Sequence, residues 1–139
     1  MSRQTLYNFN EQSSKPLVVD FLAADLQRRQ KQFGKKALLA KAVGFKSGEP
    51  LRLVDATAGF GEDALLLASL GIEVLMLERS PIVAALLTSA LERAQQDENF
   101  KKLKLQLRCE DSLQYLQTLS ERDYPDVIYL DPMYPARSK

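Results

Sequence analysis

The chain has 139 residues, of which 45% are hydrophobic, and a formal net charge of +1. That length suits a single folded domain, and the near-neutral charge predicts no global field that would attract a polyanion. The absence of histidine excludes histidine-based acid–base catalysis and histidine-containing metal sites, and a lone cysteine, Cys109, excludes a disulfide framework or a cysteine metal cluster. Since there is no apolar leader and no apolar run of membrane length, we expect a cytoplasmic protein with no metal and no membrane partner.

The front of the chain, residues 1–49, is predicted to be an extension that precedes a core over residues 50–139. From Arg28 to Lys46 it contains seven basic residues and no acidic one. Such a run could neutralise RNA phosphates, although a solvated face of helix and loop is its more common meaning. Within the extension, residues 17–21 have the pattern of a short strand, and residues 36–43 have that of a helix ended by Gly44.

The core alternates short apolar runs with helical patterns. Strands are expected at residues 51–55, 73–78, 103–107 and 127–130, and helices at residues 63–70, 82–94 and 113–119. Ser80 and Pro81 are an N-cap and a helix-opening proline, and Gly71 ends the first of the core helices. This order predicts a Rossmann-like α/β fold with a parallel sheet of order 3-2-1-4. Because the fourth strand would then be an apolar edge, we expect a fragment whose last strands are missing.

A glycine-rich turn follows the first strand, at the place where such folds bind nucleotides. Gly59 and Gly61 let the backbone approach a ligand, and together with Ala64 they also satisfy the dinucleotide fingerprint, which raises an NAD-binding alternative. Glu62 and Asp63 begin the next helix, where carboxylates would repel a diphosphate and attract a cation. The sulfonium and α-ammonium groups of S-adenosylmethionine are cationic, so these residues favour that cofactor over NAD.

Acidic residues also follow the other strands. Asp55 ends the first strand and opens the glycine turn, so we include it in the cofactor site. Glu78 ends the second strand, where a carboxylate can accept hydrogen bonds from both ribose hydroxyls of an adenosine cofactor, and Arg79 beside it could serve only to balance charge. Asp111 and Ser112 follow the third strand and could bind the adenine amino group, although both residue types are also preferred helix caps.

The most specific motif consists of Asp131, Pro132, Met133, Tyr134 and Pro135, just after the fourth strand. Two prolines and a pre-proline aspartate hold this loop extended, although a proline-rich turn that merely ends the domain is an alternative. An aromatic amine attacks a methyl group poorly until hydrogen bonds draw its lone pair out of the ring. The Asp131 carboxylate and the Pro132 carbonyl are two such acceptors, and Tyr134 would stack on an extruded base for about 1 to 3 kcal/mol. These three residues are therefore the predicted catalytic residues.

Over residues 17–135 the sequence resembles the bacterial small-subunit ribosomal RNA methyltransferase J family, class I enzymes that use S-adenosylmethionine to methylate guanine N2 in 16S ribosomal RNA. The matching segments are residues 19–21, 39–44, 54–61, 76–87 and 129–135. Met133 stands where amino methyltransferases in general have a second proline, and it is typical of this family. The resemblance implies 16S ribosomal RNA or the small ribosomal subunit as the partner. It also implies cofactor contacts at Glu62, Asp63, Glu78, Arg79, Asp111, Ser112 and Asp131.

Three alternatives remain at this point. An adenine-N6 methyltransferase acting on DNA or RNA needs the same pair of acceptors, and the residues alone do not separate the two amines. A nucleotide-binding oxidoreductase and a non-catalytic RNA-binding fragment belong to other functional classes. The sequence predicts no particular oligomeric state.

Overall fold

The computed structural model describes residues 18–22 and 26–132 of the chain. Its central element is a parallel four-stranded sheet of order β3-β2-β1-β4. The strands are β1 (Arg52–Asp55), β2 (Glu73–Glu78), β3 (Leu105–Cys109) and β4 (Val127–Tyr129). In the register of the sheet, Asp55 of β1 lies between Met76 of β2 and Tyr129 of β4. The predicted α/β fold and strand order are therefore confirmed.

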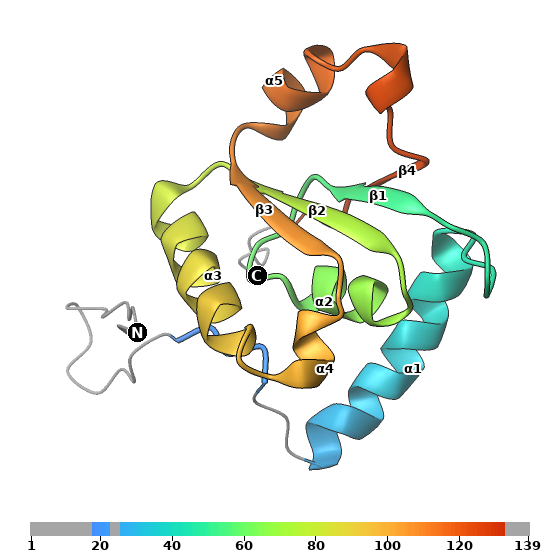
Figure 1. The fold of residues 1–139 in the computed structure, drawn as a ribbon, viewed down its shortest axis with the longest axis vertical. Coiled ribbons are helices and arrows are strands. Elements are labelled where there is room, and N and C mark those ends of the chain that lie inside the picture. The colour runs from blue at the N-terminus through green and yellow to red at the C-terminus, as the bar shows by residue number, and fades with distance from the viewer. Residues whose placement is uncertain (1–17, 23–25, 133–139) are drawn as a thin grey trace, which may run out of the picture.

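Five α-helices and one 3-10 turn connect and cover the described strands. They are α1 (Leu26–Ala42), α2 (Glu62–Ser69), α3 (Pro81–Ala94), α4 (Glu98–Lys101), α5 (Ser112–Gln117) and the 3-10 turn η1 (Glu121–Asp123). In Figure 1, α2 and α4 lie below the strands, α3 lies to their left, α1 to their lower right, and α5 above them. No helix in the described ranges is long and apolar enough to cross a membrane.

The hydrophobic core packs the sheet against the helices beneath it. Its main cluster joins Leu39 of α1 and Val43, just after that helix, to Leu67 of α2, Met76 of β2 and Phe100 of α4. Burying such side chains is the main favourable contribution to folding, about 25 cal/mol for each Å² of apolar surface. Because α1 contributes to this cluster, the predicted extension (residues 1–49) and core (residues 50–139) share one hydrophobic interior. Their division into two parts stays a prediction.

The strand predicted at residues 17–21 is wrong for the part that the structure describes, and Leu17 lies outside the described residues. Asp20 Oδ1 accepts a hydrogen bond from the backbone N–H of Leu22 at 3.0 Å, which bends the chain into a turn. The Val19 carbonyl accepts a hydrogen bond from the Arg93 guanidinium of α3 at 2.5 Å, in place of a bond from a neighbouring strand. The Val19 side chain belongs to one buried cluster with Leu86, Leu87 and Ala90 of the same helix. The backbone of this segment is therefore bonded to α3 and is not paired with a strand of the sheet.

Most helix ends follow the local signals in the sequence. Ser80 caps α3 by accepting a hydrogen bond from Val83 N at 3.4 Å, and Gly44 follows α1 with a left-handed φ of 72°. However, α1 begins at Leu26, well before the predicted start at residue 36. The short helix α4 was not predicted, although Asp97 caps it by accepting hydrogen bonds from two backbone N–H groups at 2.9 Å. Its length of four residues is too short for a periodic apolar pattern to appear.

Candidate functional site

The loop between β1 and α2 is shaped by two glycines with different surroundings. Both have left-handed backbone, with φ of 53° at Gly59 and 76° at Gly61. A Cβ added to Gly61 would lie 3.1 Å from Met76 Sδ and 3.1 Å from the Phe21 ring, whereas one added to Gly59 would only approach the Thr57 carbonyl oxygen at 4.0 Å. Gly61 is therefore required by packing against the core, while Gly59 leaves space on the ligand side of the loop.

Asp55 is buried where β1 runs into this loop. Its side chain is 1% exposed, and Oδ1 accepts a hydrogen bond from the backbone N–H of Thr57 at 3.0 Å. Burial raises the pKa of Asp55 from an ordinary 3.8 to about 6, and the nearby charges of Asp63 and Asp131 act in the same direction. The residue therefore combines a structural role in the turn with a carboxyl group whose pKa is raised.

A cavity of about 350 Å³ opens beside this loop at the carboxyl end of β1. It draws residues from the β1–α2 loop, the start of α2, the end of β4 and, unexpectedly, helix α1. Its lining consists of Lys35, Asp55, Thr57, Ala58, Gly59, Phe60, Glu62, Asp63, Tyr129 and Asp131. The carboxyl ends of parallel strands are where open α/β sheets bind ligands, so this cavity is the candidate site.

Asp63 is the centre of a charged network in the cavity wall. Its Oδ2 accepts a hydrogen bond from the Tyr129 hydroxyl at 2.7 Å, and its Oδ1 forms an ion pair with the Lys35 ammonium at 2.6 Å. The Asp63 side chain is 12% exposed and that of Lys35 is 48% exposed. The network therefore ties together α2, β4 and α1, which are distant in sequence.

The pKa shifts in this network follow from its contacts. Burial alone would raise the pKa of Asp63, but the hydrogen bonds from Lys35 and Tyr129 outweigh it and hold that pKa below its usual range. The hydrogen bond to Asp63 raises the pKa of Lys35. Burial, followed by the bond to Asp63, raises the pKa of Tyr129. At neutral pH Asp63 is thus a carboxylate and Lys35 a protonated ammonium group, and the Tyr129 hydroxyl beside them is neutral.

The segment after β4 is fixed to the β1–α2 loop by its backbone. The Asp131 N–H donates to Thr57 Oγ1 at 2.7 Å, and the Ala56 N–H donates to the Tyr129 carbonyl at 3.0 Å. Asp131 and Pro132 are exposed, and Asp131 lines the cavity. The predicted stacking residue Tyr134 lies outside the described residues. The start of the 131–135 motif is therefore held beside the glycine loop, as an active-site loop requires.

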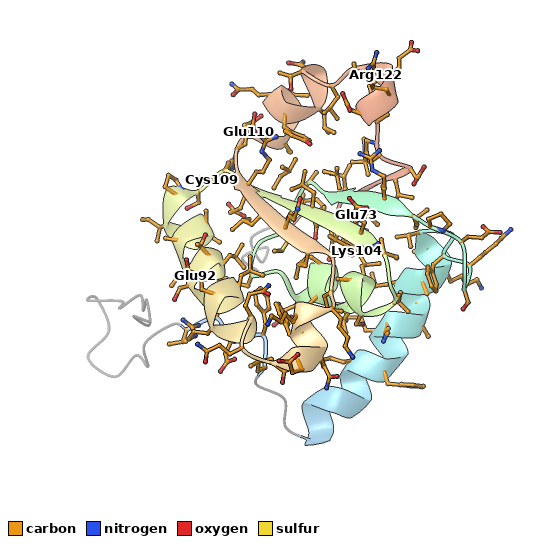
Figure 2. All side chains as sticks on the ribbon, viewed as in Figure 1. Glu73, Glu92, Lys104, Cys109, Glu110 and Arg122 are labelled. Carbon is orange, nitrogen blue, oxygen red and sulfur yellow. The ribbon has the colours of Figure 1, made fainter. Side chains whose placement is uncertain are left out.

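Two predicted pairs lie at neighbouring strand ends and do not line the cavity. Glu78 Oε1 accepts a hydrogen bond from Ser80 N at 2.9 Å, and the Glu78 carbonyl accepts one from Glu110 N at 3.0 Å, which joins the ends of β2 and β3. Asp111 caps α5, since its Oδ1 accepts a hydrogen bond from Gln114 N at 3.0 Å. Figure 2 shows Glu110 at the end of β3 that leads to α5.

The lining of the cavity overlaps with part of the predicted site, whose residues stay a prediction. The cavity lining contains five of the predicted residues, namely Asp55, Gly59, Glu62, Asp63 and Asp131. Of the other predicted residues that the structure describes, it does not contain Gly61, Glu78, Arg79, Asp111, Ser112 or Pro132. Lys35, Thr57 and Tyr129 were not predicted. A tyrosine two residues before the Asp-Pro motif was a possible signal for Tyr129, but nothing near Lys35 in the sequence distinguishes it from the other lysines of its run.

The charges of the cavity define the ligand that it fits. Four carboxylates, those of Asp55, Glu62, Asp63 and Asp131, face one ammonium group. Such a wall repels a diphosphate and attracts a cation, so it fits a sulfonium and ammonium compound better than a dinucleotide. Within the described ranges, no group of three or more histidine, cysteine, aspartate or glutamate residues could hold a metal ion.

Comparison with known proteins gives consistent matches. A family model described as "Putative SAM-dependent methyltransferase" matches residues 1–139. The chain is 51% identical over 125 residues to ribosomal RNA small subunit methyltransferase J of Coxiella burnetii. This alignment covers 89% of this chain and 48% of that protein. It is 46% identical over 138 residues to the protein of the same name from Tolumonas auensis. That alignment covers 96% of this chain and 55% of the relative. The chain thus spans about half the length of the curated relatives it matches.

A solved structure is also similar. The crystal structure of a SAM-dependent methyltransferase from Neisseria gonorrhoeae superposes with a TM-score of 0.76 at 33% sequence identity. The match covers 94% of this chain and 53% of that one. The fold is thus the Rossmann-like fold of a methyltransferase.

Proposed function

This chain belongs to the family of SAM-dependent methyltransferases, whose cofactor is S-adenosylmethionine, and we propose that it methylates the exocyclic N2 of a guanine in 16S ribosomal RNA. The partner is then 16S ribosomal RNA or the small ribosomal subunit, in keeping with the names of relatives at 46–51% identity. Because ribosomal RNA is modified where ribosomes are assembled, we place the protein in the cytoplasm.

The observation that carries this proposal is the acidic cavity at the carboxyl end of β1, with Asp131 at its edge. The cofactor supplies a methyl group on a positively charged sulfur, and a wall of four carboxylates suits that charge. Gly59 leaves the loop backbone open to the ligand. We assign Glu78 and Arg79 to the ribose and Asp111 and Ser112 to the adenine, since the first pair lies at the end of β2 and the second lies just after β3.

Asp111 caps α5, and this bond does not remove it from the proposed adenine site. One carboxylate oxygen, Oδ1, accepts the Gln114 N–H. A carboxylate has about four lone-pair sites, so a capping aspartate can also accept a bond from an amino group.

Asp131 and Pro132 prepare the amine in this mechanism. The Asp131 carboxylate and the Pro132 carbonyl accept hydrogen bonds from the two N–H groups of guanine N2, which draws the nitrogen lone pair toward tetrahedral geometry. The bond from the Asp131 N–H to Thr57 Oγ1, 2.7 Å long, fixes this acceptor pair relative to the cofactor loop. S-adenosylmethionine would supply the methyl group, with an N–CH₃ bond forming as the S–CH₃ bond breaks, and N2 would release one proton to solvent. Tyr134 is assigned to stacking on the guanine.

The test is methyl transfer to unmodified small-subunit RNA by the full-length protein and its Asp131→Ala variant. Because acceptors of this kind contribute about 10²–10³ in rate, we expect turnover to be lost while S-adenosylmethionine binding stays measurable. Asp123→Ala is a matched control, since Asp123 is exposed on η1 and does not line the cavity. Full activity in Asp131→Ala would overturn the assignment.

A further inference from the structure

The proposed cofactor carries a charge that the acidic residues cannot recognise. Its methionine end is a zwitterion, with an α-carboxylate beside the α-ammonium group. The carboxylates of the cavity match the sulfonium and the ammonium, but they would repel the α-carboxylate. An anion enclosed without a cationic partner is strongly disfavoured, so a cofactor bound here needs a positive group in the same wall.

Lys35 is the one basic side chain in the lining of this cavity. It comes from α1, far in sequence from the glycine loop, and its ammonium lies 2.6 Å from Asp63 Oδ1. An ammonium group has three N–H donors, and in the described part of the chain Asp63 is its partner. With 48% of the side chain exposed, the group retains access to a ligand in the cavity.

The position of the Lys35 ammonium is fixed by its ion pair with Asp63. Asp63 is itself held by the Tyr129 hydroxyl at 2.7 Å, so the order of contacts is Tyr129, Asp63 and then Lys35. The pKa of Lys35 is raised by the hydrogen bond to Asp63, which keeps the ammonium protonated. A pre-positioned, protonated donor next to a carboxylate presents one cationic and one anionic group side by side, as a zwitterionic ligand requires.

We propose that Lys35 binds the α-carboxylate of S-adenosylmethionine while Asp63 holds the lysine and faces the α-ammonium group. This inference rests on the proposed function and extends it to a binding residue outside the glycine loop and the strand ends. It also gives α1 a role in the site. Through Lys35, helix α1 then favours a cofactor that carries the α-carboxylate, which is a role beyond that of a basic surface.

The test compares two ligands that differ in the α-carboxylate. Calorimetry on the full-length protein measures the affinity for S-adenosylmethionine and for decarboxylated S-adenosylmethionine, which keeps the adenosine, the sulfonium and the amine. In Lys35→Met, the affinity for S-adenosylmethionine is expected to fall about 10- to 100-fold, the range of a charge-assisted hydrogen bond. The affinity for the decarboxylated ligand should stay within about twofold of the wild type, because that ligand has no group for Lys35 to bind.

Two further variants complete the experiment. Lys41→Met, at an exposed lysine in the last turn of α1 outside the cavity lining, should leave both affinities unchanged. Lys35→Gln keeps a hydrogen-bond donor for Asp63 and replaces Lys35→Met if that variant does not fold. An unchanged ratio of the two affinities in the Lys35 variants, whether both ligands weaken equally or neither does, overturns the carboxylate contact. A wild-type protein that binds neither ligand overturns the proposed function instead.

Discussion

The contact between the glycine loop and the core makes Gly61→Ala a sensitive probe of the site. Gly61 has a left-handed φ of 76°, and an added Cβ would lie 3.1 Å from both Met76 Sδ and the Phe21 ring. Left-handed backbone costs an L-residue about 1–2 kcal/mol. Forcing a methyl group into a packed core costs about 1–3 kcal/mol more. We therefore expect Gly61→Ala to lower the free energy of unfolding by about 2–5 kcal/mol.

Gly44 offers a matched control for the backbone contribution. Its φ is 72°, and a Cβ added there would meet nothing within 4 Å. Gly44→Ala should therefore cost only the backbone strain, about 1–2 kcal/mol. Urea unfolding of the full-length protein, followed by circular dichroism, measures both losses. Equal losses in the two variants would refute the reasoning, because the contact with Met76 and Phe21 would then contribute nothing.

Three further predictions concern the residues around the site. Because the pKa of Asp55 is raised to about 6, the folded state binds more protons than the unfolded state between about pH 4 and 6, and stability falls as the pH rises through that window. In the wild type this fall should be about 2 kcal/mol between pH 4 and pH 7, measured by urea unfolding, and Asp55→Asn should remove it. A pH profile like that of the wild type would contradict this. Arg93→Met removes the donor to the Val19 carbonyl and should cost about 1–3 kcal/mol in the same assay, so wild-type stability would argue against this attachment. Tyr129→Phe removes the hydroxyl bond to Asp63 and should cost about 1 kcal/mol and weaken S-adenosylmethionine binding severalfold in calorimetry, an expectation that fails if both quantities are unchanged.

The parts of the fold that depend on local signals were predictable from the sequence. The second strand was predicted over the residues where β2 lies, Glu73–Glu78, because the eight residues between Gly71 and Ser80 have room for one strand only. Ser80 and Pro81 marked the start of α3 correctly for the same local reason. The strand order followed from the alternation of strands and helices together with the handedness of crossovers.

The parts that depend on contacts between distant segments were not predictable. The ion pair of Lys35 with Asp63 requires α1 to pack beside the start of α2, and no spacing in the sequence encodes that distance. Residues 18–22 have a strand-like composition, yet Arg93 binds the Val19 carbonyl and no strand pairs with them. Composition there reflects burial against α3 and not membership of the sheet.

The assignment of the reaction itself depends on which atom receives the methyl group. The most direct measurement incubates the full-length protein with isotopically labelled S-adenosylmethionine and unmodified small ribosomal subunits, and maps the label in 16S ribosomal RNA by mass spectrometry. We predict a methyl group on N2 of a guanine, absent when Asp131→Ala replaces the wild-type protein. Label on adenine N6, or no label in RNA from a protein that binds the cofactor, would contradict the account.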